Sequence, residues 1–224
     1  STLGGTFMRR LGGADITRQV GYIEAEKGVI LPLHLYSPED KPSAVVLYLH
    51  EDGKSSISPE FIDSTIAKGH AICAVDLRGY GETKPRGNPS NWKDTVGNDW
   101  TDFKRAYLLG RSFVGMRVDD INRTANAMRS LFGEDVALHI YAVGSTTVPA
   151  MHAAALFPGR FPRFTLRNGL SSWDDVVREP YAKHVLMNTV HNALSVYDLP
   201  YLTEKTLGAA FSIENPKVRT FNVD

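Results

Sequence analysis

The chain has 224 residues, with 25 Lys and Arg against 25 Asp and Glu, so its formal net charge at pH 7 is +0. This balance excludes a global electrostatic attraction to nucleic acid or to an anionic membrane surface. No apolar run reaches the roughly 18 residues that a membrane span needs. The length and the 42% of hydrophobic residues suit one globular domain with a sizeable core.

The beginning of the chain and its single cysteine say little about the compartment. Residues 1–15 are polar and Gly-rich, which predicts a linker or lead-in before a domain that spans residues 16–224. Cys73 lies in an apolar run and is interpreted as a small buried residue, because one thiol forms no internal disulfide. The chain starts at Ser1 without a signal peptide, so we expect a periplasmic or secreted location if such a peptide was removed.

The first half of the chain predicts strands and helices in alternation. Residues 20–25 and 30–36 alternate around a Lys-Gly pair, which predicts an antiparallel hairpin. The apolar runs 44–50 and 70–76 are typical of strands buried on both faces of a parallel sheet, with a helix near 59–68 between them. Residues 100–132 show helical spacing, with charged residues such as Arg117 and Asp120 expected on the solvated sides.

The domain is expected to be organised around residues 136–150. This stretch predicts a buried strand, a sharp turn and a helix that continues through residue 156. Further strands are expected near 164–168 and 208–216, with a helical region near 172–177 and a mostly helical or irregular stretch over 185–201. Alternation of this kind after an N-terminal hairpin indicates an α/β fold with a doubly wound, mostly parallel sheet.

Two segments carry a resemblance to a known family. The run DLRGYGET at residues 76–83 is similar to the Asp-x-Arg-Gly-x-Gly-x-Ser/Thr loop that follows the fourth strand in many α/β-hydrolases. The run YLLGRSFVGMRVDDI at residues 107–121 resembles the helix before the nucleophile strand in acetyl-xylan-esterase-like (dienelactone-hydrolase-like) members. The resemblance covers roughly residues 20–215 and implies an α/β-hydrolase fold with a nucleophile elbow at mid-chain.

The resemblance also implies that part of the fold is lacking. No last strand and helix follow the strand expected at 208–216, which leaves one edge of the sheet uncovered. An uncovered edge presents unpaired backbone groups, so a second domain or a second subunit is expected to cover it.

The elbow lacks the Gly-x-Ser-x-Gly signature of these hydrolases. In phase with that signature, the three positions hold Ala142, Gly144 and Thr146, so glycine takes the place of the nucleophile. An elbow forces its central residue to positive φ, which glycine adopts without steric cost. Gly144 therefore marks a degenerate nucleophile position.

Two serines are alternative candidates for the nucleophile. A shift of one residue would use Ser145, but it would bring the β-branched Val143 and Thr147 to positions that need small residues. Ser112 lies in Gly-Arg-Ser-Phe-Val-Gly, which only superficially matches the signature, because helix-like sequence and no strand surrounds it. Ser145 is the candidate that remains.

The oxyanion loop of these hydrolases follows their third strand, which points here to the segment from His50 to Gly53. Its Glu51 and Asp52 would place carboxylates where negative charge develops during acyl transfer, which is unfavourable unless both point outward.

The acid and the base are also missing from their usual places. Only Glu214 and Asp224 follow or lie in the expected last strand, and neither belongs to a clear motif. The chain order of the family is nucleophile, acid, histidine, but the last histidines, His184 and His191, precede that strand. Acyl transfer by this chain alone therefore lacks most of its machinery.

Three functions stay open. The first is a degenerate domain related to acetyl xylan esterases, acting as an accessory or interaction domain in carbohydrate de-esterification, on acylated carbohydrate or a small ester. The second is an active serine carboxylic-ester hydrolase that uses Ser145, with its base from His184, His191 or another subunit. The third is a structural or dimerisation module.

One structural feature would separate the first function from the third. An aromatic-lined cleft above Gly144 that contains Trp92, Trp100 or Trp173 would favour the accessory domain. No cofactor and no metal are expected, because the sequence has no Cys/His ligand spacing and no glycine-rich nucleotide motif.

Overall fold

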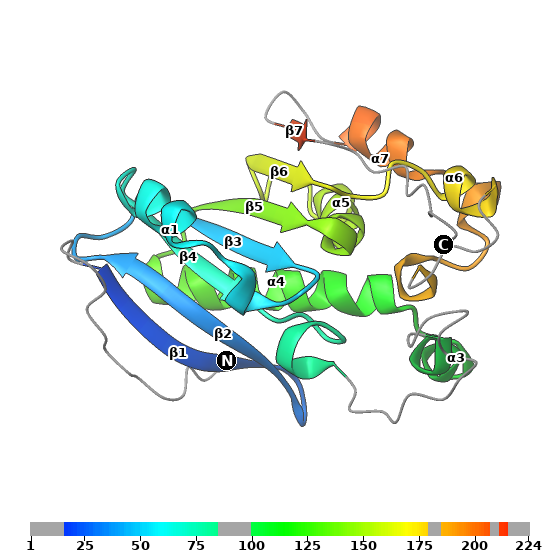
Figure 1. Ribbon diagram of the computed structural model, residues 1–224, viewed down its shortest axis with the longest axis horizontal. Helices are drawn as coiled ribbons and strands as arrows, with labels where there is room; N and C mark the ends of the chain where they lie inside the picture. Colours follow the sequence, from blue (N-terminus) through cyan, green and yellow to red (C-terminus); the bar gives the residue numbers. More distant parts are fainter. Residues whose placement is uncertain (1–15, 85–99, 179–184, 207–210, 215–224) are drawn as a thin grey trace, which may run out of the picture.

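The computed structural model describes residues 16–84, 100–178, 185–206 and 211–214. In these residues seven strands form one sheet in the order β1-β2-β4-β3-β5-β6-β7 (Figure 1). Strands β1 (Ile16–Glu26) and β2 (Val29–Pro38) form the expected antiparallel hairpin, and β2 pairs antiparallel with β4. The remaining pairs are parallel, so the predicted fold class is confirmed.

The parallel strands follow the apolar runs of the sequence. They are β3 (Ala44–His50), β4 (His70–Val75), β5 (Ala137–Val143), β6 (Arg163–Arg167) and β7 (Phe211–Glu214). Strand β3 lies at the centre of the sheet, and every residue from Ala44 to Leu49 is buried. A strand covered on both faces needs apolar side chains at successive positions, which explains its continuous run.

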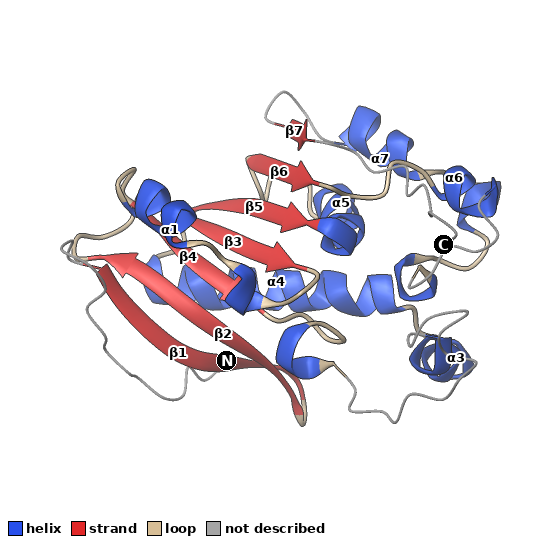
Figure 2. Cartoon of the chain, viewed as in Figure 1, coloured by secondary structure: helices blue, strands red, loops and turns tan. Residues whose placement is uncertain are grey.

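Helices cover the sheet unequally. Helices α4 (Phe113–Phe132), α5 (Thr147–Leu156) and α7 (Leu199–Thr206) contribute to the larger hydrophobic core on one face. Helix α1 (Pro59–Ile66) packs on the other face against a smaller cluster that includes Tyr48 and Ile72. Helices α3 (Trp100–Leu108) and α6 (Trp173–Arg178) lie beyond the carboxyl ends of the parallel strands (Figure 2). Among the described helices, none combines the length and apolar character that a membrane span requires.

The helix expected over residues 100–132 is two helices. Helix α3 ends at Leu108, Gly110 takes a φ of +68°, and α4 begins at Phe113. The Ser112 side chain accepts a hydrogen bond from the backbone N–H of Gly115 at 3.0 Å and so caps α4. The prediction of one continuous helix was therefore wrong. The Ser112 hydroxyl is the N-cap of α4.

The expected exposure of Arg117 and Asp120 was also wrong, since they are 1% and 0% exposed. Asp120 accepts hydrogen bonds from the backbone N–H of Arg78 at 3.1 Å and from its guanidinium at 2.6 Å. Arg78 also donates to Glu26 at 2.8 Å, and Arg117 donates to the Arg78 carbonyl at 2.9 Å. Through Arg78, the loop that follows β4 therefore connects α4 to the β1–β2 hairpin by hydrogen bonds and ion pairs.

Candidate functional site

The turn after β5 has the geometry of a nucleophile elbow. Strand β5 ends at Val143, one turn of 3₁₀ helix covers Gly144–Thr146, and α5 begins at Thr147. Gly144 has a φ of +68°, the left-handed conformation that the sequence predicts for this position. The turn lies at the carboxyl ends of the parallel strands, where open α/β sheets bind their ligands.

The side chain of Glu51 occupies the space directly above Gly144. A Cβ atom at Gly144 would lie 2.1 Å from the carboxyl carbon of Glu51 and 2.4 Å and 2.5 Å from its two oxygens. The backbone N–H of Ser145 donates to Glu51 Oε2 at 2.9 Å. The carboxylate therefore fills the place of a nucleophile side chain and accepts the N–H that, in α/β-hydrolases, follows the nucleophile and stabilises the oxyanion.

Strand register brings Glu51 to this position. Strands β3 and β5 are parallel neighbours, and His50 at the end of β3 is the partner of Val143 at the end of β5. Glu51 follows His50 and Gly144 follows Val143, so these two residues leave the sheet side by side. The Asp52 side chain lies in solvent, with 71% of its surface exposed. Of the two acidic residues in this loop, only Glu51 turns onto the elbow.

His50 and Gly53, the residues predicted for the oxyanion loop, make local bonds. His50 Nδ1 accepts from the Asp52 N–H at 3.0 Å, and burial lowers the pKa of the His50 ring. The Gly53 N–H donates to the His50 carbonyl at 2.9 Å, and Gly53 packs against Gly81 with a φ of +97°. The His50 ring and the Gly53 N–H therefore form hydrogen bonds within residues 50–53. Their role in an oxyanion hole stays a prediction.

The half-buried hydroxyl of Ser145 bonds to a tyrosine. Ser145 Oγ lies 2.9 Å from the hydroxyl of Tyr80, which lies 3.1 Å from Asn188 Oδ1. Asn188 Oδ1 also accepts from Arg117 at 3.0 Å, and the Arg117 guanidinium lies 3.9 Å from the centre of the Tyr80 ring. A phenol is a poor base at neutral pH, so this network supplies no group that would take the serine proton.

Sequence reasoning missed this polar network. Tyr80 lies in the loop that carries the family resemblance, but at one of its variable positions. Asn188 lies in a stretch interpreted only as helical or irregular, where a 3₁₀ turn, η4 (Leu186–Asn188), forms instead. No motif marked Asn188, because its role arises from contacts with residues 71 and 108 positions earlier in the chain.

The contacts of His191 and His152 do not include Ser145. His191 is exposed, with its ring 5.3 Å from the ring of Tyr107. His152 is buried in α5, with Nδ1 2.7 Å from the Val148 carbonyl and Nε2 2.9 Å from the Tyr197 hydroxyl. Burial lowers the pKa of His152 and so favours its neutral ring. His184 lies outside the described residues.

The two carboxylates considered for the catalytic acid give no support to a triad. Glu214 in β7 forms an ion pair with Arg167 of the neighbouring strand, with Nε and Oε2 2.8 Å apart. Asp224 lies outside the described residues. In the part of the chain that the structure describes, no group of three or more His, Cys, Asp or Glu side chains could hold a metal ion.

The tryptophans give a mixed answer to the expectation of an aromatic cleft. Trp173 is buried, and its indole N–H donates to the Asn188 carbonyl at 2.9 Å. Trp173 lines a pocket, but the residues that line this pocket do not include Gly144 or Ser145. Trp100 begins α3, where the Lys104 ammonium lies 4.3 Å from its ring centre, and Trp92 lies outside the described residues.

Comparisons with known proteins bear on the fold. No protein-family model matches the sequence, and no curated protein matches it. The structure is similar to that of a cold-adapted esterase from an Arctic intertidal metagenomic library, with a TM-score of 0.58 at 15% identity over 97% of this chain and 90% of that one. It is also similar to acetyl xylan esterase 1 from a Thermoanaerobacterium species, with a TM-score of 0.54 at 14% identity over 78% of this chain and 55% of that one.

These likenesses, together with the strand order and the elbow, decide the fold. The chain has an α/β-hydrolase fold. The resemblance to acetyl-xylan-esterase-like proteins is confirmed at the level of the fold. In this α/β-hydrolase fold the elbow backbone is present, its central residue is Gly144, and the carboxylate of Glu51 covers it.

Proposed function

We propose that this domain is a catalytically degenerate, esterase-like α/β-hydrolase domain that acts as an accessory or interaction domain in carbohydrate de-esterification. The observation that carries the proposal is the Glu51 carboxylate, which lies against Gly144 and accepts the N–H of Ser145. The substrate class, an acylated carbohydrate or a small ester, rests on the likeness in fold to an acetyl xylan esterase.

The position of Glu51 opposes acyl transfer in two ways. The N–H of Ser145 already donates to a carboxylate, so it is not free to stabilise the oxyanion of a tetrahedral intermediate. The negative charge of an ionised Glu51 would also repel the negative charge that develops in that intermediate. Since Gly144 supplies no nucleophile, the elbow lacks both its reacting group and a favourable electrostatic environment.

An active esterase that uses Ser145 is the alternative. It requires a base beside Ser145 Oγ, and the hydrogen-bond partner of this hydroxyl is Tyr80. Of the two histidines considered for this role, His191 contacts Tyr107 instead. The alternative therefore depends on His184 or on a histidine from another subunit.

Hydrolysis of p-nitrophenyl acetate at neutral pH tests the absence of catalysis. We expect the wild-type protein, Ser145→Ala and the control Ser55→Ala, which changes an exposed serine, to show the rate of buffer alone. A wild-type rate well above buffer that collapses in Ser145→Ala and persists in Ser55→Ala would establish Ser145 as a nucleophile and sink the proposal.

Affinity electrophoresis tests the accessory role. We expect migration of the domain to be retarded in a gel that contains acetylated xylan and unchanged in a gel that contains the same xylan after deacetylation. Migration in both gels at the mobility seen in a gel without xylan would contradict the carbohydrate role and leave a structural or dimerisation module.

A further inference from the structure

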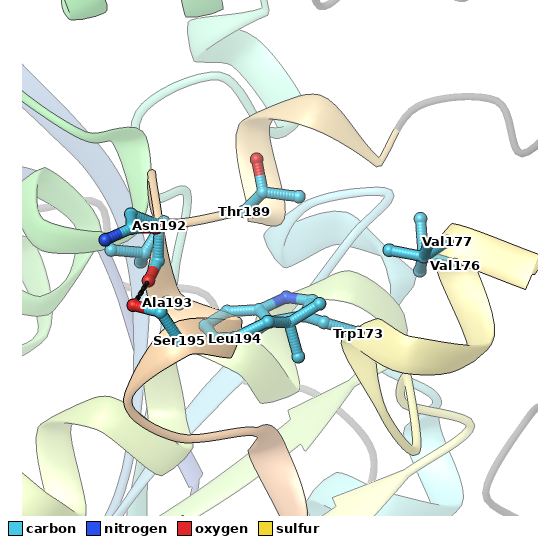
Figure 3. A pocket seen from close by; sticks show the side chains of 9 residues that line it. Trp173, Val176, Val177, Thr189, Asn192, Ala193, Leu194 and Ser195 are labelled. Atoms are coloured by element: carbon cyan, nitrogen blue, oxygen red, sulfur yellow. Dashed lines mark hydrogen bonds between the residues drawn. The ribbon is translucent and has the colours of Figure 1, made fainter.

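A pocket of about 240 Å³ lies between α6 and residues 189–195, the segment that contains the 3₁₀ turn η5 (Ala193–Ser195). Figure 3 shows the ring of Trp173 at its base, Val176 and Val177 to one side and Thr189 above. The pocket is distinct from the elbow, because Gly144, Ser145 and Glu51 do not line it. A proposal about this pocket therefore does not rest on the proposed function.

The base of the pocket is rigidly held. Trp173 is 3% exposed, its indole N–H donates to the Asn188 carbonyl at 2.9 Å, and its backbone N–H donates to Asp198 at 2.8 Å. Its ring also packs against the rings of His152 and Tyr197, with centroids 5.6 Å and 5.5 Å away. A base fixed in this way is organised before any ligand arrives, so binding does not have to order it.

The described lining is mainly apolar, and its polar side chains are the uncharged Thr189, Asn192 and Ser195. None of the nine described residues that line the pocket is ionisable. The hydroxyls of Thr189 and Ser195 donate to backbone carbonyls of their own turns, each at 2.8 Å, so their protons are already used. A charged ligand would lose part of its hydration here without gaining a partner of opposite charge among the described lining residues.

The rim of the pocket exposes large apolar side chains. Val177 and Leu194 are 67% and 46% exposed, and both line the pocket. A ligand with an aliphatic body would remove part of this apolar surface from water, which is favourable. Pockets for drug-sized ligands typically measure about 300–1,000 Å³. This pocket is smaller, so it suits a small ligand. We propose that this pocket is a binding site for a small neutral molecule with an aliphatic body.

Two probes of matched size test the chemistry of the pocket. Cyclohexylmethanol is neutral, and cyclohexanecarboxylate carries a negative charge on a similar ring. In NMR titrations of the full chain, we expect cyclohexylmethanol to shift the Trp173 indole N–H and the Val176 methyl signals in a saturable way. We expect cyclohexanecarboxylate to bind at least about tenfold more weakly. The absence of a saturable shift, or equal affinity for both probes, would overturn the proposal.

A filling substitution tests the location. Val176→Phe adds bulk inside the pocket and should raise the dissociation constant of cyclohexylmethanol at least about tenfold. The control Val196→Phe changes a residue that is 82% exposed and does not line the pocket, so affinity should stay at the wild-type value. If Val176→Phe does not fold, Val177→Trp at the exposed rim replaces it. Wild-type affinity in a folded filling variant would place the ligand elsewhere and contradict the proposal.

Discussion

At the residue scale, Gly144 and Glu51 form one unit. Glycine is favoured at position 144 by its positive φ, and a Cβ atom there would have to displace the Glu51 carboxylate. The sequence predicts the first reason, since an elbow places its central residue at positive φ. The second reason depends on the register of β3 against β5, which the sequence leaves open.

A double-mutant cycle measures this unit. Gly144→Ser alone should lower the free energy of unfolding by at least about 2 kcal/mol, because backbone strain adds to the loss of the hydrogen bond from the Ser145 N–H when the new side chain displaces the Glu51 carboxylate. In the background of Glu51→Gly, only the backbone cost of about 1–2 kcal/mol should remain. Urea denaturation of the four proteins gives the coupling. An equal loss in both backgrounds would show that Glu51 does not occupy the elbow in solution.

The second prediction at this scale concerns pH. Burial, followed by the charges of Arg163 and His70, lowers the pKa of His139 to about 4. The unfolded chain therefore binds a proton at this histidine below about pH 6.5, while the folded protein stays neutral until about pH 4. The contribution of neutral His139 to the free energy of unfolding is therefore complete above about pH 6.5 and is lost as the pH falls from about 6.5 to about 4.

Urea denaturation at several values between pH 7 and pH 4.5 checks the effect of His139. We expect stability to fall as the pH falls, and His139→Gln should make the fall shallower. The control His191→Gln removes an exposed histidine and should leave the slope unchanged. The same slope in wild type and His139→Gln would refute the assignment.

At the scale of elements, sequence periodicity misses the contact between Asp120 of α4 and Arg78 of the loop after β4. Asp120 is fully buried against Arg78, which lies 42 residues earlier in the chain. A helical pattern indicates which positions share a face but not which loop packs on that face. The break between α3 and α4 was missed for a related reason, since Gly110 and the cap at Ser112 stop a run that has helical spacing on both sides.

Asp120→Asn should therefore be strongly destabilising. It removes the charge of the main partner of the largely buried Arg78 guanidinium and keeps only Glu26, so the loss should lie toward the lower end of the about 3–5 kcal/mol typical of a buried charge without any partner. The matched control is Asp174→Asn, which breaks the exposed pair with Arg178 and should cost less than about 1 kcal/mol. Thermal and urea denaturation compare the two. Similar small losses in both variants would contradict a fastening role for the loop after β4.

At the scale of the whole molecule, the sequence predicts the scaffold better than the chemistry. The central strands were predicted nearly to the residue, because burial on both faces leaves continuous apolar runs. The contents of the site were harder to predict, because Tyr80, Asn188 and Glu51 meet there from three separate loops. Only the tertiary arrangement shows that the Ser145 hydroxyl contacts a phenol and that a carboxylate covers the elbow.

The central claim is that this α/β-hydrolase fold carries no activated serine at its elbow. Incubation of the full chain with a fluorophosphonate, followed by mass spectrometry of the intact protein and its peptides, tests this claim most directly. The reagent phosphonylates serines that an adjacent base activates. We predict an unchanged mass and an unmodified peptide around Ser145. A stoichiometric adduct on Ser145 would contradict the account and show that the chain has a working nucleophile.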